Sequence, residues 1–259
     1  MRPGSVRWVG GTLLLPAVLL GLGGVGAGGD PLHQDLMAAL SPPGSGWLLG
    51  TDELGRSLLL RLAHATRVSA GLALFCVALA WCGGVALGLA AAWRGGWANQ
   101  VVLGGADTLM AFPGLLLTLL VAGLLGGGVV ALVAGVALAQ LPQAVRMSRA
   151  LADGVLARPF VQASRLVGLS APGILWRDVV PLLLPQLLTQ AALSVAQAVL
   201  TIAALGFLGI GVHPPTPEWG MMIADGAPHL AEAPWVVLVP AGLLVTSVLG
   251  LVLLAEDVR

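Results

Sequence analysis

Long apolar runs, separated by shorter polar segments, dominate the pattern of residues along the chain. Each run is apolar on all sides and lacks the two-residue alternation of a membrane β-strand, so a helix is the way in which its backbone can satisfy its hydrogen bonds in lipid. A helix needs about 20 residues to cross a hydrocarbon core about 30 Å thick. The pattern therefore predicts an all-α, polytopic membrane protein with six transmembrane helices, at about residues 8–28, 68–93, 101–125, 129–145, 182–212 and 234–254.

The composition indicates that the main solvent of this chain is the lipid bilayer. Of its 259 residues, 58% are hydrophobic and 9% are charged, whereas about a quarter of an average soluble domain is charged. The formal net charge is zero, and no clustered basic face indicates a nucleic-acid partner. Because Lys is absent, the chain cannot contain the G-x-x-x-x-G-K-[ST] phosphate loop. If the protein uses ATP, another chain must bind it.

A polar segment at residues 30–67 separates the first run from the second. In its later half, at 53–67, the charged and polar side chains fall within an arc of about 140°, which predicts an amphipathic helix along the membrane surface. Asp52 and Arg56 have the i,i+4 spacing of a local salt bridge. We therefore divide the chain into an N-terminal span (1–29), this segment (30–67) and a core with five spans (68–259). For residues 1–29, a cleaved signal peptide is the alternative.

The distribution of Arg predicts the orientation, since short cytoplasmic loops of membrane proteins are enriched in basic residues. With the N-terminus in the cytoplasm, nine Arg residues lie in inside segments and three in outside segments. The loop between the fifth and sixth spans, at about 213–233, has no Arg and three acidic residues. Both termini and the polar segment at about 146–181 are therefore expected in the cytoplasm.

The segment 146–181 is long enough for two short helices and too short for a domain. Gly168 is placed to end the first helix, Ser170 to cap the second, and Pro172 to occupy its first turn, where no N–H is needed. Apolar residues alternate with Arg and Asp from residue 165 to residue 178. This mixture is typical of a segment that docks in the groove of a partner. A connector in water or on the membrane surface is the alternative.

The stretch FVQASRLVGLSAPGILWRDVVP, at residues 160–181, resembles the cytoplasmic signature loop of the membrane subunits of binding-protein-dependent ABC importers. That pattern is written E-A-A-x-x-x-G, then nine residues, then I-x-L-P. On this chain it falls on Gln162, Ala163, Ser164, Gly168, Asp178, Val180 and Pro181. The second, fourth and seventh of these match the pattern. At three of the other positions Gln replaces the acid, Ser the second Ala, and Asp the Ile.

Three further segments are similar to the dipeptide, oligopeptide and nickel branch of the same family. LGTDELGRSLLLRLAHATRVSAGLAL (49–74) resembles L-G-T-D-x-x-G-R-D-x-x-S-R, with Ser57 in place of Asp. LGFLGIGVHPPTPEWGMMIADG (205–226) resembles L-x-F-L-G-L-G-x-x-P-P-x-P-x-W-G, and MAFPGLLLTLL (110–120) resembles a third-span pattern of that branch. The segments follow the family order from about residue 48 to residue 255.

The resemblance implies a type I ABC importer fold with six transmembrane helices and a cytoplasmic coupling loop at about 146–181. It implies a permease in a bacterial inner membrane, forming the path for a peptide, or for nickel or a metal chelate. The implied partners are a second permease subunit in a heterodimer, two ATP-binding subunits and an extracytoplasmic solute-binding protein. The chain itself would then be no enzyme and would hold no cofactor. Contact with the ATPase is expected at Gln162, Ala163, Ser164, Arg165, Gly168, Asp178 and Pro181.

Other residues are candidates for the solute path and for binding-protein docking. Asp107, Phe112 and Pro113 lie in the third span and are expected along the path. An acid without a transport role and a proline that only bends the helix are the alternatives. Docking of the binding protein is expected at Asp52, Arg56, Pro215 and Trp219. Their alternatives are a structural salt bridge, a rigid turn and an interfacial Trp anchor.

Two further possibilities are weaker. His and acidic residues share the loop 213–233 and could in principle bind a transition metal, but they lack a tight ligand spacing, so no metal site is predicted: His213, Glu218, Asp225, His229 and Glu232. A secondary transporter or channel acting alone would usually show internal repeats, and none is evident. An intramembrane hydrolase would need a nucleophile and base, or two acids, at one depth, and the sequence offers no such pair.

Overall fold

The computed structural model describes residues 3–23, 29–44 and 46–256, and within them the regular secondary structure is helical, apart from one isolated bridge between Thr51 and Ser57. The elements are α1 (Pro3–Gly23), η1 (Leu36–Ala38), α2 (Leu58–Arg94), α3 (Gly96–Met110), α4 (Gly114–Leu124), α5 (Gly128–Leu156), α6 (Pro159–Leu166), α7 (Ala171–Ile174), the π-helical turn η2 (Leu175–Val179), α8 (Val180–Phe207), α9 (Trp219–Gly226), η3 (Ala227–His229) and α10 (Trp235–Glu256). The predicted all-α class is confirmed for these residues. The predicted end of the first span at residue 28 lies outside them.

Four helices are long and apolar enough to cross a membrane: α2, α5, α10 and the continuous helix Ala171–Phe207, which α7, η2 and α8 form together. The pair α3 and α4 gives a fifth crossing if it is counted as one span, and a bend of 93° separates its halves. The apolar part of α1, Val9–Gly21, is shorter. By length and composition the described helices thus give four or five crossings, and the count of six stays a prediction.

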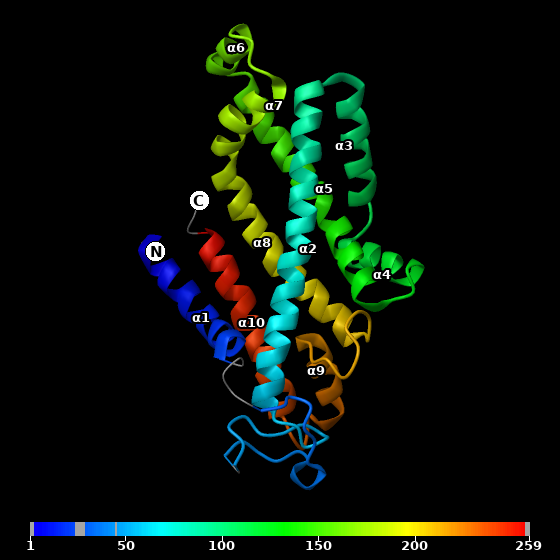
Figure 1. Ribbon diagram of the computed structural model, residues 1–259. Coiled ribbons are helices and arrows are strands. Elements are labelled where there is room, and N and C mark those ends of the chain that lie inside the picture. The colour runs from blue at the N-terminus through cyan, green and yellow to red at the C-terminus, as the bar shows by residue number, and fades with distance from the viewer. Residues whose placement is uncertain (1–2, 24–28, 45, 257–259) are drawn as a thin grey trace.

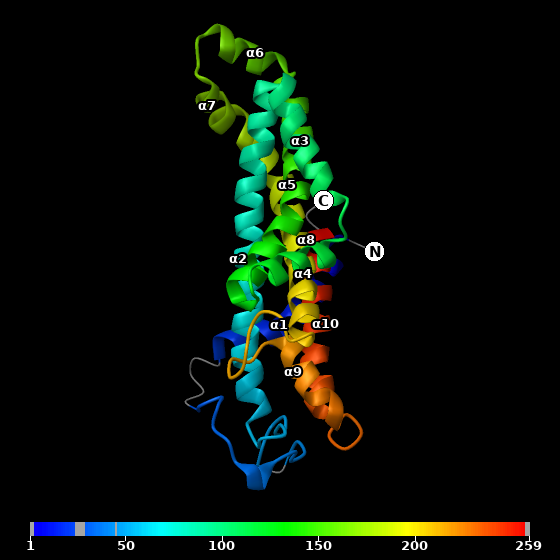
Figure 2. The same ribbon diagram turned by 90° about the vertical axis from the view of Figure 1, so that its right-hand side faces the viewer.

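The helices form an elongated bundle with one loop region at each end (Figures 1 and 2). The coupling loop, with α6 and α7, lies at the upper end in Figure 1, and the segment before α2 lies at the lower end together with α9. The beginning of α1 and the end of α10 both point toward the end that carries α6. The sequence predicts the same grouping, since it assigns the termini and the coupling loop to one side.

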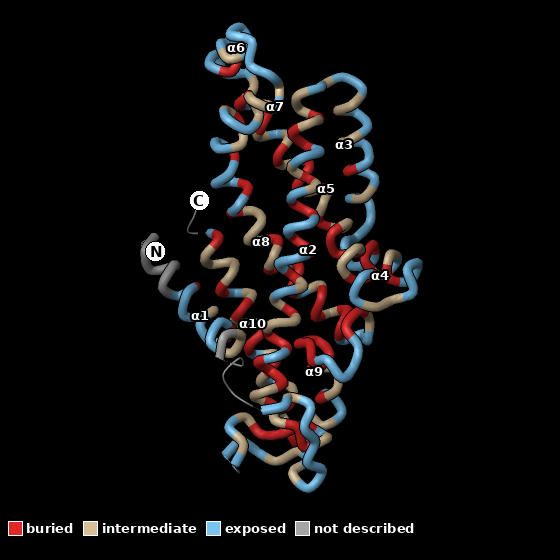
Figure 3. The backbone as a smooth tube through the Cα atoms, in the orientation of Figure 1, coloured by how far each residue is buried: buried red, intermediate tan, exposed pale blue. Residues whose placement is uncertain are grey.

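Small residues bring α2 and α5 close together in the middle of the bundle. A Cβ on Gly84 would lie 2.5 Å from the Cβ of Ala144, and a Cβ on Gly88 would collide with the Oγ of Ser148. The Ser148 hydroxyl donates to the Ala144 carbonyl of its own helix at 2.7 Å. Such contacts are typical of membrane helices, whose association depends on close packing. Figure 3 shows the buried positions of α2, α5 and α8, where the core lies.

Two helix boundaries differ from the prediction. The prediction of a separate surface helix at 53–67 is wrong, because α2 begins at Leu58 and continues into the span without a break. Two of its Arg side chains have partners inside the protein: Arg61 is only 4% exposed and contacts Asp52, and Arg67 donates to the Gly21 carbonyl. In addition, α5 continues to Leu156, eleven residues past the predicted end of the fourth span at residue 145. The part of the predicted loop that lies between the two long helices is therefore residues 157–170.

Candidate functional site

The coupling loop begins with α6, whose end is fixed by a glycine. Gly168 has φ +86°, in the left-handed region, where a side chain is strained by about 1–2 kcal/mol. Its N–H donates to the Arg165 carbonyl at 3.0 Å, and the next N–H donates to the Ser164 carbonyl at 3.2 Å. The prediction that Gly168 ends the first helix is confirmed, and the turn after it is tight.

The second helix of the loop is continuous with a membrane span. Ser170 caps α7 by accepting the Gly173 N–H at 3.4 Å, and Pro172 occupies the first turn, as predicted. After α7 the chain makes the π-helical turn η2 and enters α8 without interruption. The predicted helix, turn and helix are present, with the difference that the second helix forms the beginning of the span. Any displacement of α7 is therefore transmitted directly to α8.

Two side-chain contacts fix α6 to the rest of the bundle. Ser164 Oγ donates to Asp178 Oδ2 at 2.7 Å, which joins α6 to η2. The Arg165 guanidinium lies 4.5 Å from the centre of the Trp93 ring at the end of α2, a cation–π contact. Both acceptors come from helices that enter the membrane. The sequence predicts a contact of Asp178 with the ATPase, whereas the structure shows that this carboxylate has a partner within its own chain.

Apolar side chains are left exposed at the tip of the loop. Leu166, Val167 and Trp176 are 88%, 82% and 74% exposed, while Val161 and Ile174 are fully buried beneath them. Gln162, Ala163, Gly168 and Pro181 are also exposed. Exposed apolar groups gathered next to polar ones are typical of a docking surface. The loop thus carries an exposed apolar surface above buried Val161 and Ile174.

A second candidate site is the face where α5 and α8 turn toward each other, which we call the amide face. A cavity of about 310 Å³ lies there, and the residues that line it include Gln140, Gln143, Gln197 and Thr201. A second cavity of about 500 Å³, nearer the coupling loop, is lined by Arg158 and Gln186, among others. At 100° per residue, Gln186, Gln190, Gln197 and Thr201 fall within about 60° on α8. The amide face therefore extends along much of that helix.

The residues predicted for the path lie beside this face and not within it. Asp107 of α3 is exposed and lies 3.5 Å from the Arg146 guanidinium. Phe112 is half exposed, and Pro113 marks the bend between α3 and α4, as expected for a proline that interrupts a span. The following residue, Gly114, lines the smaller cavity. The sequence analysis did not predict these glutamines as part of the path. Gln186, Gln190 and Gln197 of α8 are separated by four and seven residues, a spacing that places them on one face of a helix.

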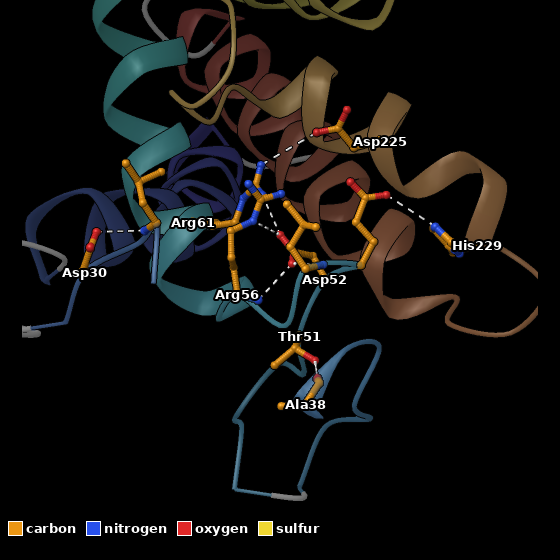
Figure 4. A network of polar contacts seen from close by, with 11 residues as sticks. Asp30, Ala38, Thr51, Asp52, Arg56, Arg61, Asp225 and His229 are labelled. Carbon is orange, nitrogen blue, oxygen red and sulfur yellow. Dashed lines mark hydrogen bonds and ion pairs between the residues drawn. The ribbon is translucent and has the colours of Figure 1, made fainter. Parts of the chain in front are cut away.

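The third cluster lies at the opposite end of the bundle, around Asp52 (Figure 4). Its carboxylate accepts from Arg56 Nε at 2.7 Å and from Arg61 Nη1 at 2.5 Å. Arg61 also approaches Asp225 at 3.8 Å, and His229 approaches Glu53 at 3.4 Å. Burial, and then the Glu53 carboxylate, raise the pKa of Asp225. The predicted pair of Asp52 and Arg56 is confirmed as a buried structural contact.

This burial bears on the residues expected to dock the binding protein. Asp52 and Arg56 are 5% and 7% exposed, and Trp219 is 1% exposed. Only Pro215 is at the surface. Trp219 is therefore no interfacial anchor, because its ring is enclosed by α2, α8 and α10 instead of reaching the membrane surface. In this conformation Asp52, Arg56 and Trp219 lie below the surface and support the loops that form it.

The residues of the loop 213–233 that were considered as metal ligands have other partners. Glu218 is buried, accepts from Ser69 Oγ and from the Met221 N–H at 3.0 Å each, and caps α9. Its burial raises its pKa. His229 contacts Glu232 at 2.6 Å. Among the residues that the structure describes, no group of three His, Cys, Asp or Glu side chains is placed to share a metal ion.

Comparison with known proteins places these features in one family. Residues 84–255 match the family described as binding-protein-dependent transport system inner membrane component. The di/tripeptide transport system permease protein DppC of Pseudomonas aeruginosa is 39% identical over 236 residues, covering 89% of this chain and 78% of the relative. The nickel transport system permease protein NikC of Escherichia coli is 35% identical, with coverages of 89% and 83%. The glutathione transport system permease protein GsiD of Pectobacterium atrosepticum is 31% identical, with coverages of 84% and 72%.

Proposed function

Because the chain belongs to the family of binding-protein-dependent transport system inner membrane components, we propose that it forms half of the membrane channel of an ATP-driven importer for peptides or metal complexes. The observation that carries this proposal is the coupling loop. It is held by a helix cap and two side-chain contacts, it is continuous with a membrane span, and it leaves Leu166, Val167 and Trp176 exposed. These are the properties that a contact with a motor subunit requires.

The proposed assembly contains a second permease, two ATP-binding subunits and an extracytoplasmic binding protein. Closure of the ATPase pair on ATP would displace the two coupling loops, and each loop would rotate the helices to which it is joined. The cation–π contact between Arg165 and Trp93 supports this mechanism, since it links the loop to α2 as well as to α8. The two membrane subunits are proposed to differ, as the family resemblance implies.

The proposed orientation places the coupling loop and both termini in the cytoplasm of a bacterium and the Asp52 cluster outside the inner membrane. It is supported by the excess of Arg in the segments assigned to the inside. The binding protein would then dock on the outer loops, where Pro215 is exposed. Asp52, Arg56 and Trp219 would hold these loops in position.

We propose the amide face as this chain's contribution to the solute path, with Phe112 and Pro113 at its border and Asp107 beyond them. Amide and hydroxyl groups both donate and accept hydrogen bonds without a net charge. They suit the peptide groups of a di- or oligopeptide, whereas a bare divalent cation is better bound by carboxylate or imidazole. A neutral metal complex is the second candidate, and the similarity to NikC supports it. Competition for uptake among dipeptides, longer peptides, free Ni²⁺ and metal chelates tests this choice.

The loop is tested by replacing the glycine that ends α6. Gly168→Val places a branched side chain at φ +86°, so α6 cannot end in its present turn. We expect uptake into proteoliposomes to fall at least about tenfold, the effect of about 1.4 kcal/mol, while the amount of protein in the membrane stays normal and ATP hydrolysis continues without transport.

Two variants control this experiment. Gly168→Asn should retain most uptake, because Asn tolerates the left-handed region. Gly105→Val makes the same change on α3, at a glycine with no neighbour within 4 Å and no positive φ, and should leave coupling intact. Normal uptake by Gly168→Val would contradict the proposed role of the loop.

A further inference from the structure

At the end of the bundle opposite the coupling loop, ion pairs join the segment before α2 to α9 and η3 (Figure 4). The buried Arg61 contacts Asp52 at 2.5 Å on one side and Asp225 of α9 at 3.8 Å on the other. His229 of η3 contacts Glu53 at 3.4 Å. Since Asp52 and Glu53 precede α2, whereas Asp225 and His229 follow α8, these contacts hold together two parts of the chain that are far apart in sequence.

Both ring nitrogens of His229 face a carboxylate. Nδ1 lies 2.6 Å from Glu232 Oε1, three residues further along the same loop, and Nε2 lies 3.4 Å from Glu53 Oε2. A neutral imidazole carries one N–H and can donate to one carboxylate, whereas an imidazolium donates to two. The arrangement therefore suits the charged ring. Because Glu232 is the nearer carboxylate and belongs to the same loop, the contact with Glu53 is the one that depends on the second proton.

The surroundings of His229 also favour its charged form. In the described part of the chain, four carboxylates and two guanidiniums face the small cavity that the ring lines or contact the ring itself: Asp52, Glu53 and Arg56 before α2, Arg61 of α2, Asp225 of α9 and Glu232 after η3. From α10 the same cavity receives Val236, which does not titrate. The hydrogen bond with Glu232 raises the pKa of His229, burial opposes this rise, and the charges of Glu232 and Glu53 add to it.

We propose that His229 makes the attachment of the segment before α2 dependent on pH. As the imidazolium it holds Glu53, and as the neutral ring it releases Glu53 while Arg61 still holds Asp225. An unperturbed His titrates near pH 6.5, and the pKa of His229 in the folded protein is raised. The contact with Glu53 is therefore fully present below about pH 6.5 and is lost as the pH rises through the raised value.

The proposed orientation gives this pH dependence a consequence for docking. It places the contact outside the cytoplasm, where the pH is that of the surroundings, and on the side where the binding protein would dock. The surface offered to that protein would then change as the segment before α2 is released. This consequence rests on the proposed function, whereas the pH dependence of the contact between His229 and Glu53 does not.

Hydrogen exchange of the complete transporter in lipid nanodiscs, followed by mass spectrometry, tests the proposal. Two amides report on the contact: the Arg56 N–H donates to Asp52 Oδ1 at 2.9 Å, and the Ala233 N–H donates to the His229 carbonyl at 2.8 Å. Exchange of residues 53–57 and 227–233 is measured at about pH 6 and about pH 9 and corrected for the intrinsic rate. We expect the parent chain to lose protection in both segments at the higher pH.

Two substitutions at one position separate charge from size. His229→Arg is charged at both pH values and should stay protected at both, whereas His229→Gln is never charged and should lack this protection at both. The control is His64→Gln, which removes an exposed His from α2 and should keep the loss seen in the parent. A loss that persists in His229→Gln, or that is equally large in His229→Arg, would overturn the proposal. The exchange rates do not depend on transport, so failure here is distinguishable from failure of the proposed function.

Discussion

Ser164 and Asp178 are two positions at which the coupling loop departs from the family pattern, and the structure shows that they bond to each other. The pattern has Ala and Ile at these positions, a pair that can only pack. Here a hydroxyl donates to a carboxylate at 2.7 Å across the same gap. A polar pair thus takes the place of an apolar one, and the two replacements explain each other. Neither residue alone indicates this in the sequence.

The two residues are therefore expected to be coupled in a double-mutant cycle. Asp178→Ala and Ser164→Ala should each lower the thermal stability of the purified permease, because each leaves half of a hydrogen bond without its partner. The double variant should be less destabilised than the sum, with a coupling energy of about 0.5–1.5 kcal/mol. Melting curves of the four chains in detergent measure it. Strict additivity would show that the contact contributes nothing.

Sequence reasoning at this scale succeeded where a residue acts through its own backbone. Gly168, Ser170 and Pro172 have the predicted roles because left-handed φ, capping and a missing N–H are local properties. It failed where a residue acts through a distant partner. Trp219 was expected at the membrane interface and is buried in the core instead, since its surroundings come from helices far away in the sequence.

At the scale of the elements, α2 and α5 form the central contact of the bundle. Both helices present small residues to each other, and Gly84 and Gly88 lie one turn apart in that contact. In lipid, where apolar helices gain little from leaving the solvent, this close approach determines which helices pair. The hydropathy pattern predicts that the two spans exist but not that they are partners.

Gly84 and its neighbour Gly83 provide a matched pair of variants for this contact. A Cβ on Gly84 would meet the Ala144 Cβ at 2.5 Å and the Leu141 carbonyl at 2.9 Å, whereas a Cβ on Gly83 has its first neighbour at 3.8 Å. Gly84→Ala should therefore destabilise the permease by about 1–3 kcal/mol through overpacking. Gly83→Ala should be neutral or slightly stabilising. Thermal unfolding in detergent compares them, and equal melting temperatures would contradict the close contact.

The predicted element boundaries failed for a physical reason. The polar arc at 53–67 was assigned to the membrane surface because sequence periodicity distinguishes polar from apolar faces but does not distinguish a solvated face from a buried ion pair. Asp52, from the loop before α2, neutralises Arg61 on the first turns of the helix. This contact allows Arg61 to be buried in the first turns of α2, a helix of 37 residues.

At the scale of the whole molecule, the two candidate sites share one helix. The coupling loop continues through η2 into α8, and α8 carries Gln186, Gln190 and Gln197 of the amide face. The sequence predicted the loop in detail, because a known pattern covers it. It did not predict the amide face, because single glutamines in an apolar run become a feature only when α5 and α8 are brought together.

The amide face is tested by replacing Gln197, an exposed member of the set that lines the smaller cavity. Gln197→Leu should lower the uptake of a labelled dipeptide severalfold and leave co-purification of the ATPase unchanged, because the coupling loop is untouched. Gln100→Leu makes the same change at an exposed position on α3 and serves as the control. If both variants transport alike, the solute does not pass along this face.

The continuous helix from Ala171 to Phe207 contains 37 residues, which corresponds to a length of about 55 Å. Its far end carries Gly206, against which the Glu218 carboxylate packs so closely that no methyl group would find room. Because the helix is continuous through η2 and Pro185, a rotation imposed at Trp176 would consequently be passed along it and shift the contact with α9 on the opposite side of the membrane. In the proposed importer, ATP binding on one side would in this way change the surface that the binding protein meets on the other side, before any solute has moved.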